Sequence, residues 1–187
     1  MRNGRTARDV EAFLGSTLVF SRAVTEVVDV QVLAEAAQDR LTAPQFTALR
    51  LAEQQPLTIG ELAALLDVSN AAASKTVDRL VRRGLAVRRE GSKDRRATEV
   101  RLTGRGRALM ARYETARAAM LAKAFGEFPA QQLRRTARLL DRLSSSLVSH
   151  SSNNGKTCLR CHVYGAERCP VSGSTEGCRN GGSRGRE

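Results

Sequence analysis

The chain has 187 residues, of which 31 are Lys or Arg and 19 are Asp or Glu, so its formal net charge is +12. Only 4% of residues are aromatic and Trp is absent, so a core must be built from Leu, Val and Ala, which favours helices over sheets. No apolar run approaches the roughly eighteen residues of a membrane span, and residues 1–8 are not followed by a signal-peptide pattern. We therefore expect one cytoplasmic domain, with or without a tail, and no membrane partner.

The positive charge is unevenly distributed along the chain. The net charge is −1 over residues 1–40 but +6 over residues 41–107. A basic segment of this kind favours a polyanionic partner. Arg outnumbers Lys 27 to 4, so part of the excess is equally consistent with codon bias.

Two helices are predicted before the basic segment. Apolar residues recur at spacings of three and four from Asp9 to about Ala37, which predicts one long helix. Thr42 is placed to cap a second helix that runs to about Gln54, with Pro44 in its first turn, where a missing N–H costs nothing.

The next two helices form a recognisable pair. Thr58 and Glu61 form a capping box in front of a short helix over residues 59–66. After a three-residue turn, Ser69 caps a second helix that ends at Gly84. Two helices separated by so tight a turn are the signature of a helix-turn-helix.

A change of period marks the segment that follows. Residues 85–103 alternate with a period of two around a charged turn, which predicts a β-hairpin with a basic tip. Two more helices are predicted over residues 104–125 and 130–147, the second with Leu133, Ala137, Leu140 and Leu143 inward. The fold expected is mainly α with a small β-hairpin wing. Its predicted parts are an N-terminal dimerisation helix (1–38), a winged helix-turn-helix (39–104), C-terminal dimerisation helices (105–148) and a Gly/Ser-rich tail (149–187).

The second helix of the pair is placed to enter a DNA major groove. Its first turn carries small and hydrogen-bonding side chains that suit base edges. Basic side chains follow in the next turn of the helix and in the hairpin, which also contains Arg101. Arg96, at the tip, is our candidate for a minor-groove contact. The alternative is a solvated helix face beside a basic turn, but the two caps and the Arg-rich hairpin together favour DNA binding. The predicted contacts are Ser69, Asn70, Ala71, Ala72, Ser74, Lys75, Thr76, Arg79, Arg88, Arg89, Lys93, Asp94, Arg95 and Arg96.

Short motifs between residues 41 and 106 carry a family resemblance. They are Leu41-Thr42 with Gln45, Thr58-Ile-Gly-Glu-Leu-Ala, Val68-Ser69, Ser74-Lys75, Leu80-Val-Arg-Arg-Gly84-Leu, Asp94-Arg95-Arg96-Ala97, and Leu102-Thr103 with Gly106. With the flanking helices, roughly residues 10–148 resemble the MarR (multiple antibiotic resistance regulator) family of bacterial transcription factors. The resemblance implies a homodimer with interleaved terminal helices, symmetric binding of double-stranded operator DNA, and repression relieved by a signal. It also implies that Asp94 orients Arg96, and that a small-molecule effector binds between the dimerisation helices and the DNA-binding domain.

The apolar stripe of the first helix supports a dimer independently of the resemblance. It extends from Val10 to Leu33, which is more than one small winged domain covers. A partner subunit is the natural cover, and a purely intramolecular core is the alternative.

The four cysteines of the chain all lie in the tail. Cys158, Cys161, Cys169 and Cys178 fall on a Gly-rich segment with few large apolar residues, outside the usual MarR pattern. Four thiolates on such a segment suit a metal, whose binding replaces the missing hydrophobic stabilisation. Both zinc and an iron–sulfur cluster accept four thiolates, and the irregular spacing with a Cys-Pro step slightly favours iron–sulfur.

Other interpretations of the tail stay open at this point. Cys158-x-x-Cys161-His162 matches the c-type haem attachment motif, which belongs to exported proteins, and the same two thiols match a redox dithiol without the usual βαβ context. A disordered tail with incidental cysteines is the third alternative. No arrangement of residues suggests an enzyme, since neither His150 nor His162 has a serine or carboxylate pattern beside it.

Overall fold

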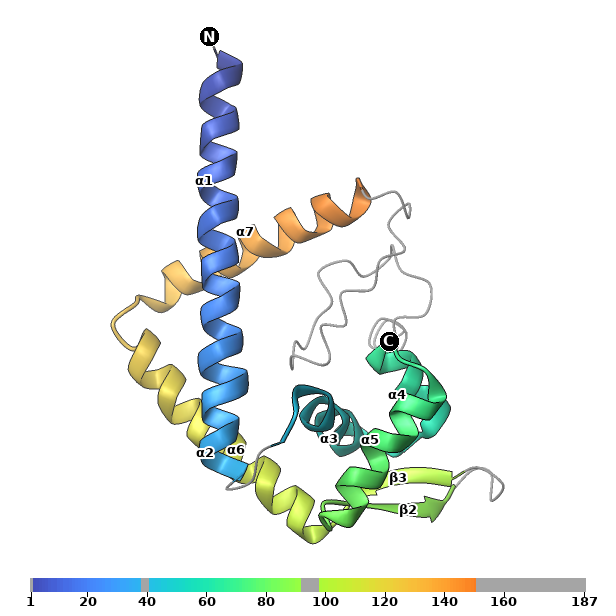
Figure 1. Ribbon diagram of the computed structural model, residues 1–187. Helices are drawn as coiled ribbons and strands as arrows, with labels where there is room; N and C mark the ends of the chain where they lie inside the picture. Colours follow the sequence, from blue (N-terminus) through green and yellow to red (C-terminus); the bar gives the residue numbers. More distant parts are fainter. Residues whose placement is uncertain (1, 38–40, 92–97, 151–187) are drawn as a thin grey trace, which may run out of the picture. The chain divides into compact units, whose positions relative to one another are not determined.

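The computed structural model describes residues 2–37, 41–91 and 98–150. The chain divides into two compact units, one up to Leu121 and the other from Ala122 onward. The first unit contains the helix-turn-helix, the hairpin and the N-terminal helix, and the second contains the last helix (Figure 1). No helix among the described residues is long and apolar enough to cross a membrane.

The first helix is continuous, as predicted, but it changes geometry along its length. It begins as α1 (Arg2–Ala23), earlier than predicted, continues as a π-helical segment η1 (Val24–Gln31) and ends as α2 (Val32–Ala37). Over eight residues the apolar spacing of a π-helix and that of an α-helix differ too little to be distinguished by sequence. The α2 end is buried, whereas the side chains of residues 6–16 are all exposed.

The next three helices begin and end close to the predicted positions because their caps form. α3 (Ala43–Gln54) begins with the Thr42 N–H donating to Gln45 Oε1 at 3.1 Å. α4 (Ile59–Leu66) begins with a reciprocal box, in which the Thr58 N–H donates to Glu61 Oε2 at 2.9 Å and the Glu61 N–H donates to Thr58 Oγ1 at 3.2 Å. α5 (Asn70–Arg82) follows the turn.

The hairpin belongs to a three-stranded antiparallel sheet. β2 (Ala86–Glu90) and β3 (Thr98–Leu102) pair as predicted, with Ala86 opposite Leu102 and Arg88 opposite Val100. β1 (Leu57–Thr58) pairs with the other edge of β3, which gives the order β1-β3-β2. β1 was not predicted from the sequence, because two residues are too few to show an alternating period. Gly84, with a positive φ of 67°, makes the left-handed turn between α5 and β2.

The core of the first unit lies between the helix-turn-helix, the sheet and α6 (Gly104–Phe125), which has the predicted bounds. Along α6, Leu109, Met110 and Tyr113 are buried, and Met120 and Leu121 are half-buried. The largest side chains with less than 2% exposure are Tyr113, Leu49, Leu57, Leu62, Leu80, Met110, Val77 and Val100.

The second unit contains α7 (Ala130–Ser149), again close to the predicted bounds. The prediction for its inward face was wrong for this single chain, because Leu133 and Ala137 are exposed and Leu140 and Leu143 are only partly covered. An amphipathic helix buries its apolar stripe only where another surface covers it. Leu147, which is 68% exposed, adds to the uncovered apolar surface.

Candidate nucleic-acid interface

Helix α5 has one buried and one exposed face. Ala73, Val77 and Leu80 are buried against the rest of the unit. At about 100° per residue, the opposite face carries side chains that the structure leaves exposed. They are Ala71, Lys75, Arg79 and Arg82. The helix therefore presents a basic face with a small side chain near its N-terminus.

The first turn of α5 is fixed by its cap. The Ala72 N–H donates to Ser69 Oγ at 3.2 Å, so the Ser69 hydroxyl oxygen is already used within the protein. Asn70, Ala71 and Ala72 are exposed, as predicted for residues that approach a ligand. The Thr76 hydroxyl donates back to the Ala72 carbonyl at 3.0 Å, so its proton is also occupied.

The hairpin is anchored directly to the end of α5. The Leu85 N–H donates to the Leu80 carbonyl at 3.0 Å, and Thr103 Oγ1 donates to the Gly84 carbonyl at 2.7 Å. In Figure 1, α5 lies beside β2. The structure therefore places the predicted recognition helix and the base of the predicted wing next to each other.

The two arginines of β2 lie on opposite faces of the sheet, because successive strand side chains alternate. Arg88 shares a face with the buried Ala86 and points toward α5, where its Nη1 lies 2.7 Å from Asp78 Oδ1 and its Nη2 donates to Ser74 Oγ at 3.0 Å. Arg89, on the other face, is exposed and lines a cavity. Asp78 was not predicted as a site residue, since nothing in the sequence relates it to a residue ten positions later.

Several predicted residues lie outside the part of the chain that the structure describes. They are Lys93, Asp94, Arg95 and Arg96 of the wing and the four cysteines Cys158, Cys161, Cys169 and Cys178. At the edge of the wing, Arg101 Nη2 lies 2.8 Å from Glu99 Oε2, so its charge is paired within the hairpin. Among the described residues, no group of three His, Cys, Asp or Glu side chains is arranged to hold a metal ion.

Two cavities flank this region within the first unit. One, of about 400 Å³, is lined by three arginines and four apolar side chains: Arg83, Arg105, Arg112, Ala37, Leu41, Leu85 and Leu109. The other, of about 580 Å³, lies at the base of the hairpin and includes Glu53, Arg89, Arg101 and Arg107. Burial raises the pKa of the Glu53 carboxyl, and the nearby Glu114 carboxylate adds to this effect.

Comparison with known proteins agrees with this geometry. Residues 41–97 match the MarR family model. The chain is 34% identical over 106 residues to the HTH-type transcriptional repressor Rv2887 of Mycobacterium tuberculosis, an alignment that covers 56% of this chain and 76% of that protein. It is 34% identical over 97 residues to the transcriptional regulator AdcR of Streptococcus pneumoniae, which covers 52% of this chain and 64% of AdcR.

Solved structures give the same result. The transcriptional repressor CouR, bound to a 23-mer DNA duplex, is similar with a TM-score of 0.55 and 26% identity, over 74% of this chain and 95% of CouR. Rv2887 of Mycobacterium tuberculosis in complex with p-aminosalicylic acid is similar with a TM-score of 0.50 and 30% identity, over 70% of this chain and 98% of that one. The chain therefore belongs to the MarR family of winged-helix transcription regulators, and it is not an enzyme.

Proposed function

We propose that this protein is a homodimeric repressor that binds double-stranded operator DNA through α5 and the hairpin wing. The exposed face of α5 carries this proposal: Ala71 leaves room for close approach to base edges, and Lys75, Arg79 and Arg82 supply positive charge beside it. The similarity to CouR, a repressor bound to a DNA duplex, supports it. Arg89 and the tip residues Lys93, Arg95 and Arg96 extend the basic surface in sequence, with Arg96 proposed for the minor groove and Asp94 as its orienting carboxylate.

The exposed apolar side chains of α1 support the dimer. Leu18 is 65% exposed and Phe20 is 50% exposed, and both lie near further uncovered side chains on the same helix: Val10, Phe13, Leu14 and Val19. Soluble proteins rarely leave contiguous apolar surface of this kind uncovered. We propose that the helices of a second copy cover it, in a symmetric interface.

Selection from a pool of random DNA duplexes tests the DNA-binding proposal. The wild-type protein should enrich a near-palindromic sequence, and Arg79→Ala and Arg96→Ala should each weaken binding to that duplex in a shift assay. Both variants should elute with the wild type on a sizing column, because neither substitution touches the dimer surface. Failure of the wild type to enrich any sequence would refute operator binding.

The dimer is tested by placing a charge on the apolar stripe of α1. Leu18→Glu should shift the protein to the monomer on a sizing column, because a buried unpaired carboxylate is costly. Arg8→Glu places a carboxylate at an exposed position that is already charged, about 160° around the helix from Val10, and should leave the dimer intact. Equal elution of both variants with the wild type would remove α1 from the interface.

The arginine-lined cavity favours a second element of the proposal, a small-molecule effector. Arg83, Arg105 and Arg112 line this cavity together with apolar side chains, and this combination suits an aromatic or aliphatic carboxylate. The complex of Rv2887 with p-aminosalicylic acid supports this class. Adding p-aminosalicylate should release the wild-type protein from its duplex, and Arg112→Ala should abolish the response. Arg107→Ala, in the other cavity, is the matched control and should still respond.

The four cysteines favour a third element, a metal or redox sensor in the tail. We propose that Cys158, Cys161, Cys169 and Cys178 bind an iron–sulfur cluster, slightly in preference to zinc, and that its state modulates DNA binding. Protein purified without oxygen should be brown and contain iron and sulfide, whereas colourless protein with zinc would favour a structural site. Full metal retention in all four Cys→Ser variants would exclude the site. Regulation that survives deletion of residues 150–187 would assign the signal to the cavity instead.

A further inference from the structure

We infer that Arg88 is a positioning residue that acts on DNA through Ser74 and Asp78, in place of the direct DNA contact predicted from the sequence. The inference rests on the proposed function, since it assigns a role within the DNA-binding surface. It makes Ser74 a specificity-determining hydrogen-bond donor whose direction is set by the wing.

The face of the sheet on which Arg88 lies fixes where its guanidinium points. Arg88 is opposite Val100 in the ladder and two residues from Ala86, and both of these side chains are buried. This face packs against α5 (Figure 1). The Arg88 side chain therefore extends from the edge of the core across to α5, and reaching a phosphate requires breaking its contacts with Asp78 at 2.7 Å and Ser74 at 3.0 Å.

The contact with Ser74 determines which way the serine proton is directed. Arg88 Nη2 donates to Ser74 Oγ, so the oxygen accepts and the hydroxyl proton is left to donate. Ser74 Oγ donates to no residue that the structure describes, whereas the Thr76 hydroxyl already donates to the Ala72 carbonyl and Ser69 Oγ accepts from the Ala72 N–H. A directed hydroxyl donor suits an acceptor on a base edge, such as guanine N7 or O6 or thymine O4.

The contact with Asp78 removes a repulsive charge from the same surface. Around the axis of α5, Asp78 lies between the exposed basic face and Ser74, and its side chain is 46% exposed. A bare carboxylate there would repel DNA phosphates, and the attraction within the pair grows when DNA excludes water. In the free protein the pair is solvated and adds little to stability, because exposed ion pairs are weak. Substitutions of Arg88 should therefore leave the fold intact.

Salt dependence separates a positioning role from a phosphate contact. Each phosphate contact that is lost makes the slope of log K against log salt shallower by about 0.9. Arg88→Ala should weaken binding to the selected duplex about tenfold or more, with a slope close to that of the wild type. Arg89→Ala is the matched control, because it removes the same charge from the opposite face of the same strand. A slope for Arg88→Ala that is shallower than that of the wild type by about 0.9 per subunit would overturn the inference.

A double variant and a repeated selection complete the test. Arg88→Ala with Asp78→Asn should recover most of the lost affinity, because the unpaired carboxylate is gone. When the selection from random duplexes is repeated with Ser74→Ala and with Arg88→Ala, both variants should lose the base preference at the same position in each half of the palindrome. The preference for the correct base over the others should fall by about fivefold to a hundredfold. Absence of rescue, or an unchanged preference in both selections, would overturn the inference while leaving operator binding intact. If the wild-type protein binds no duplex, it is the proposed DNA-binding function that is refuted, and not the role of Arg88 alone.

Discussion

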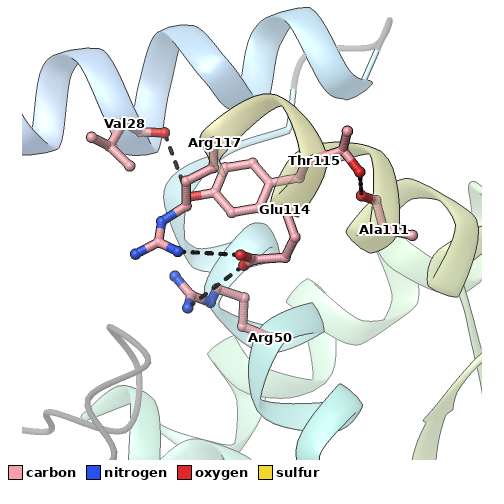
Figure 2. Close-up of polar contacts among 7 residues, drawn as sticks. Val28, Arg50, Ala111, Glu114, Thr115 and Arg117 are labelled. Carbon is pink, nitrogen blue, oxygen red and sulfur yellow. Dashed lines mark hydrogen bonds and ion pairs between the residues drawn. The ribbon is translucent and has the colours of Figure 1, made fainter. Parts of the chain in front are cut away.

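The ring of Phe46 lies edge-on against the ring of Tyr113, with centroids 4.6 Å apart and planes at 66°. Phe46 comes from α3 and Tyr113 from α6, and the Tyr113 hydroxyl donates to the carbonyl of Val28, in η1, at 3.5 Å. Figure 2 shows that carbonyl above the ion pairs of Glu114 with Arg50 and Arg117, at 4.0 Å and 3.2 Å. The Tyr113 side chain of α6 thus contacts both α3, through its ring, and η1, through its hydroxyl.

Truncating this contact should destabilise the protein strongly. Phe46→Ala should lower the free energy of unfolding by about 3–5 kcal/mol, because Phe46 is buried and a cavity would remain beside Tyr113. Tyr113→Phe keeps both rings and loses only a long hydrogen bond, so its cost should be about 1 kcal/mol. Urea unfolding at one fixed protein concentration measures both. Similar losses for the two variants would show that the hydroxyl, and not the ring contact, dominates.

The two glycines at the start of α6 should respond in opposite ways to alanine. A methyl group at Gly106 would collide with the backbone carbonyl of Leu85, so Gly106→Ala should lower the melting temperature despite the better helix propensity of alanine. Nothing lies within 4 Å of the corresponding position at Gly104. Gly104→Ala should therefore be neutral or stabilise the protein by up to about 1 kcal/mol. Equal melting temperatures for the two variants would contradict the close packing at Gly106.

The cap of α4 should contribute measurably to stability. Thr58→Ala removes the oxygen that accepts from the Glu61 N–H, and should cost about 1 kcal/mol in the free energy of unfolding. Thr115→Ala is the control: its hydroxyl only donates back to the Ala111 carbonyl within α6, at 3.0 Å, and it is exposed (Figure 2). That substitution should change stability by less than about 0.5 kcal/mol. A larger loss for Thr115→Ala than for Thr58→Ala would refute the cap's contribution.

Stability should depend on pH through Asp29. Burial raises the pKa of its carboxyl above the ordinary 3.8, and the guanidinium groups of Arg50 and Arg117 offset only part of this. The folded state therefore holds the proton more tightly than the unfolded chain, so ionised Asp29 lowers stability at neutral pH, and the penalty disappears as the pH falls through the raised pKa. Asp29→Asn should raise the melting temperature at neutral pH but not below pH 3.8. A lower melting temperature at neutral pH would show that the arginine contacts dominate.

Local signals predicted most of the fold because they act over a few residues. The caps at Thr58 and Ser69, the turn at Gly84 and the change of period at residue 85 each depend on neighbours within four positions. The π-helical segment was not predicted, because its apolar spacing resembles that of an α-helix. Strand β1 was not predicted either, because it consists of two residues that pair with a strand about forty positions later.

The sequence by itself determined the order and bounds of the helices, the hairpin, the basic middle segment and the family resemblance. Each of these depends on short-range patterns of residue type. Only the tertiary structure decided which side chains meet across the fold. It placed Arg88 on Asp78 and Ser74, Tyr113 on Phe46, and Gly106 against Leu85. These contacts join residues far apart in the chain, and they depend on how helices and strands pack, which no local pattern encodes.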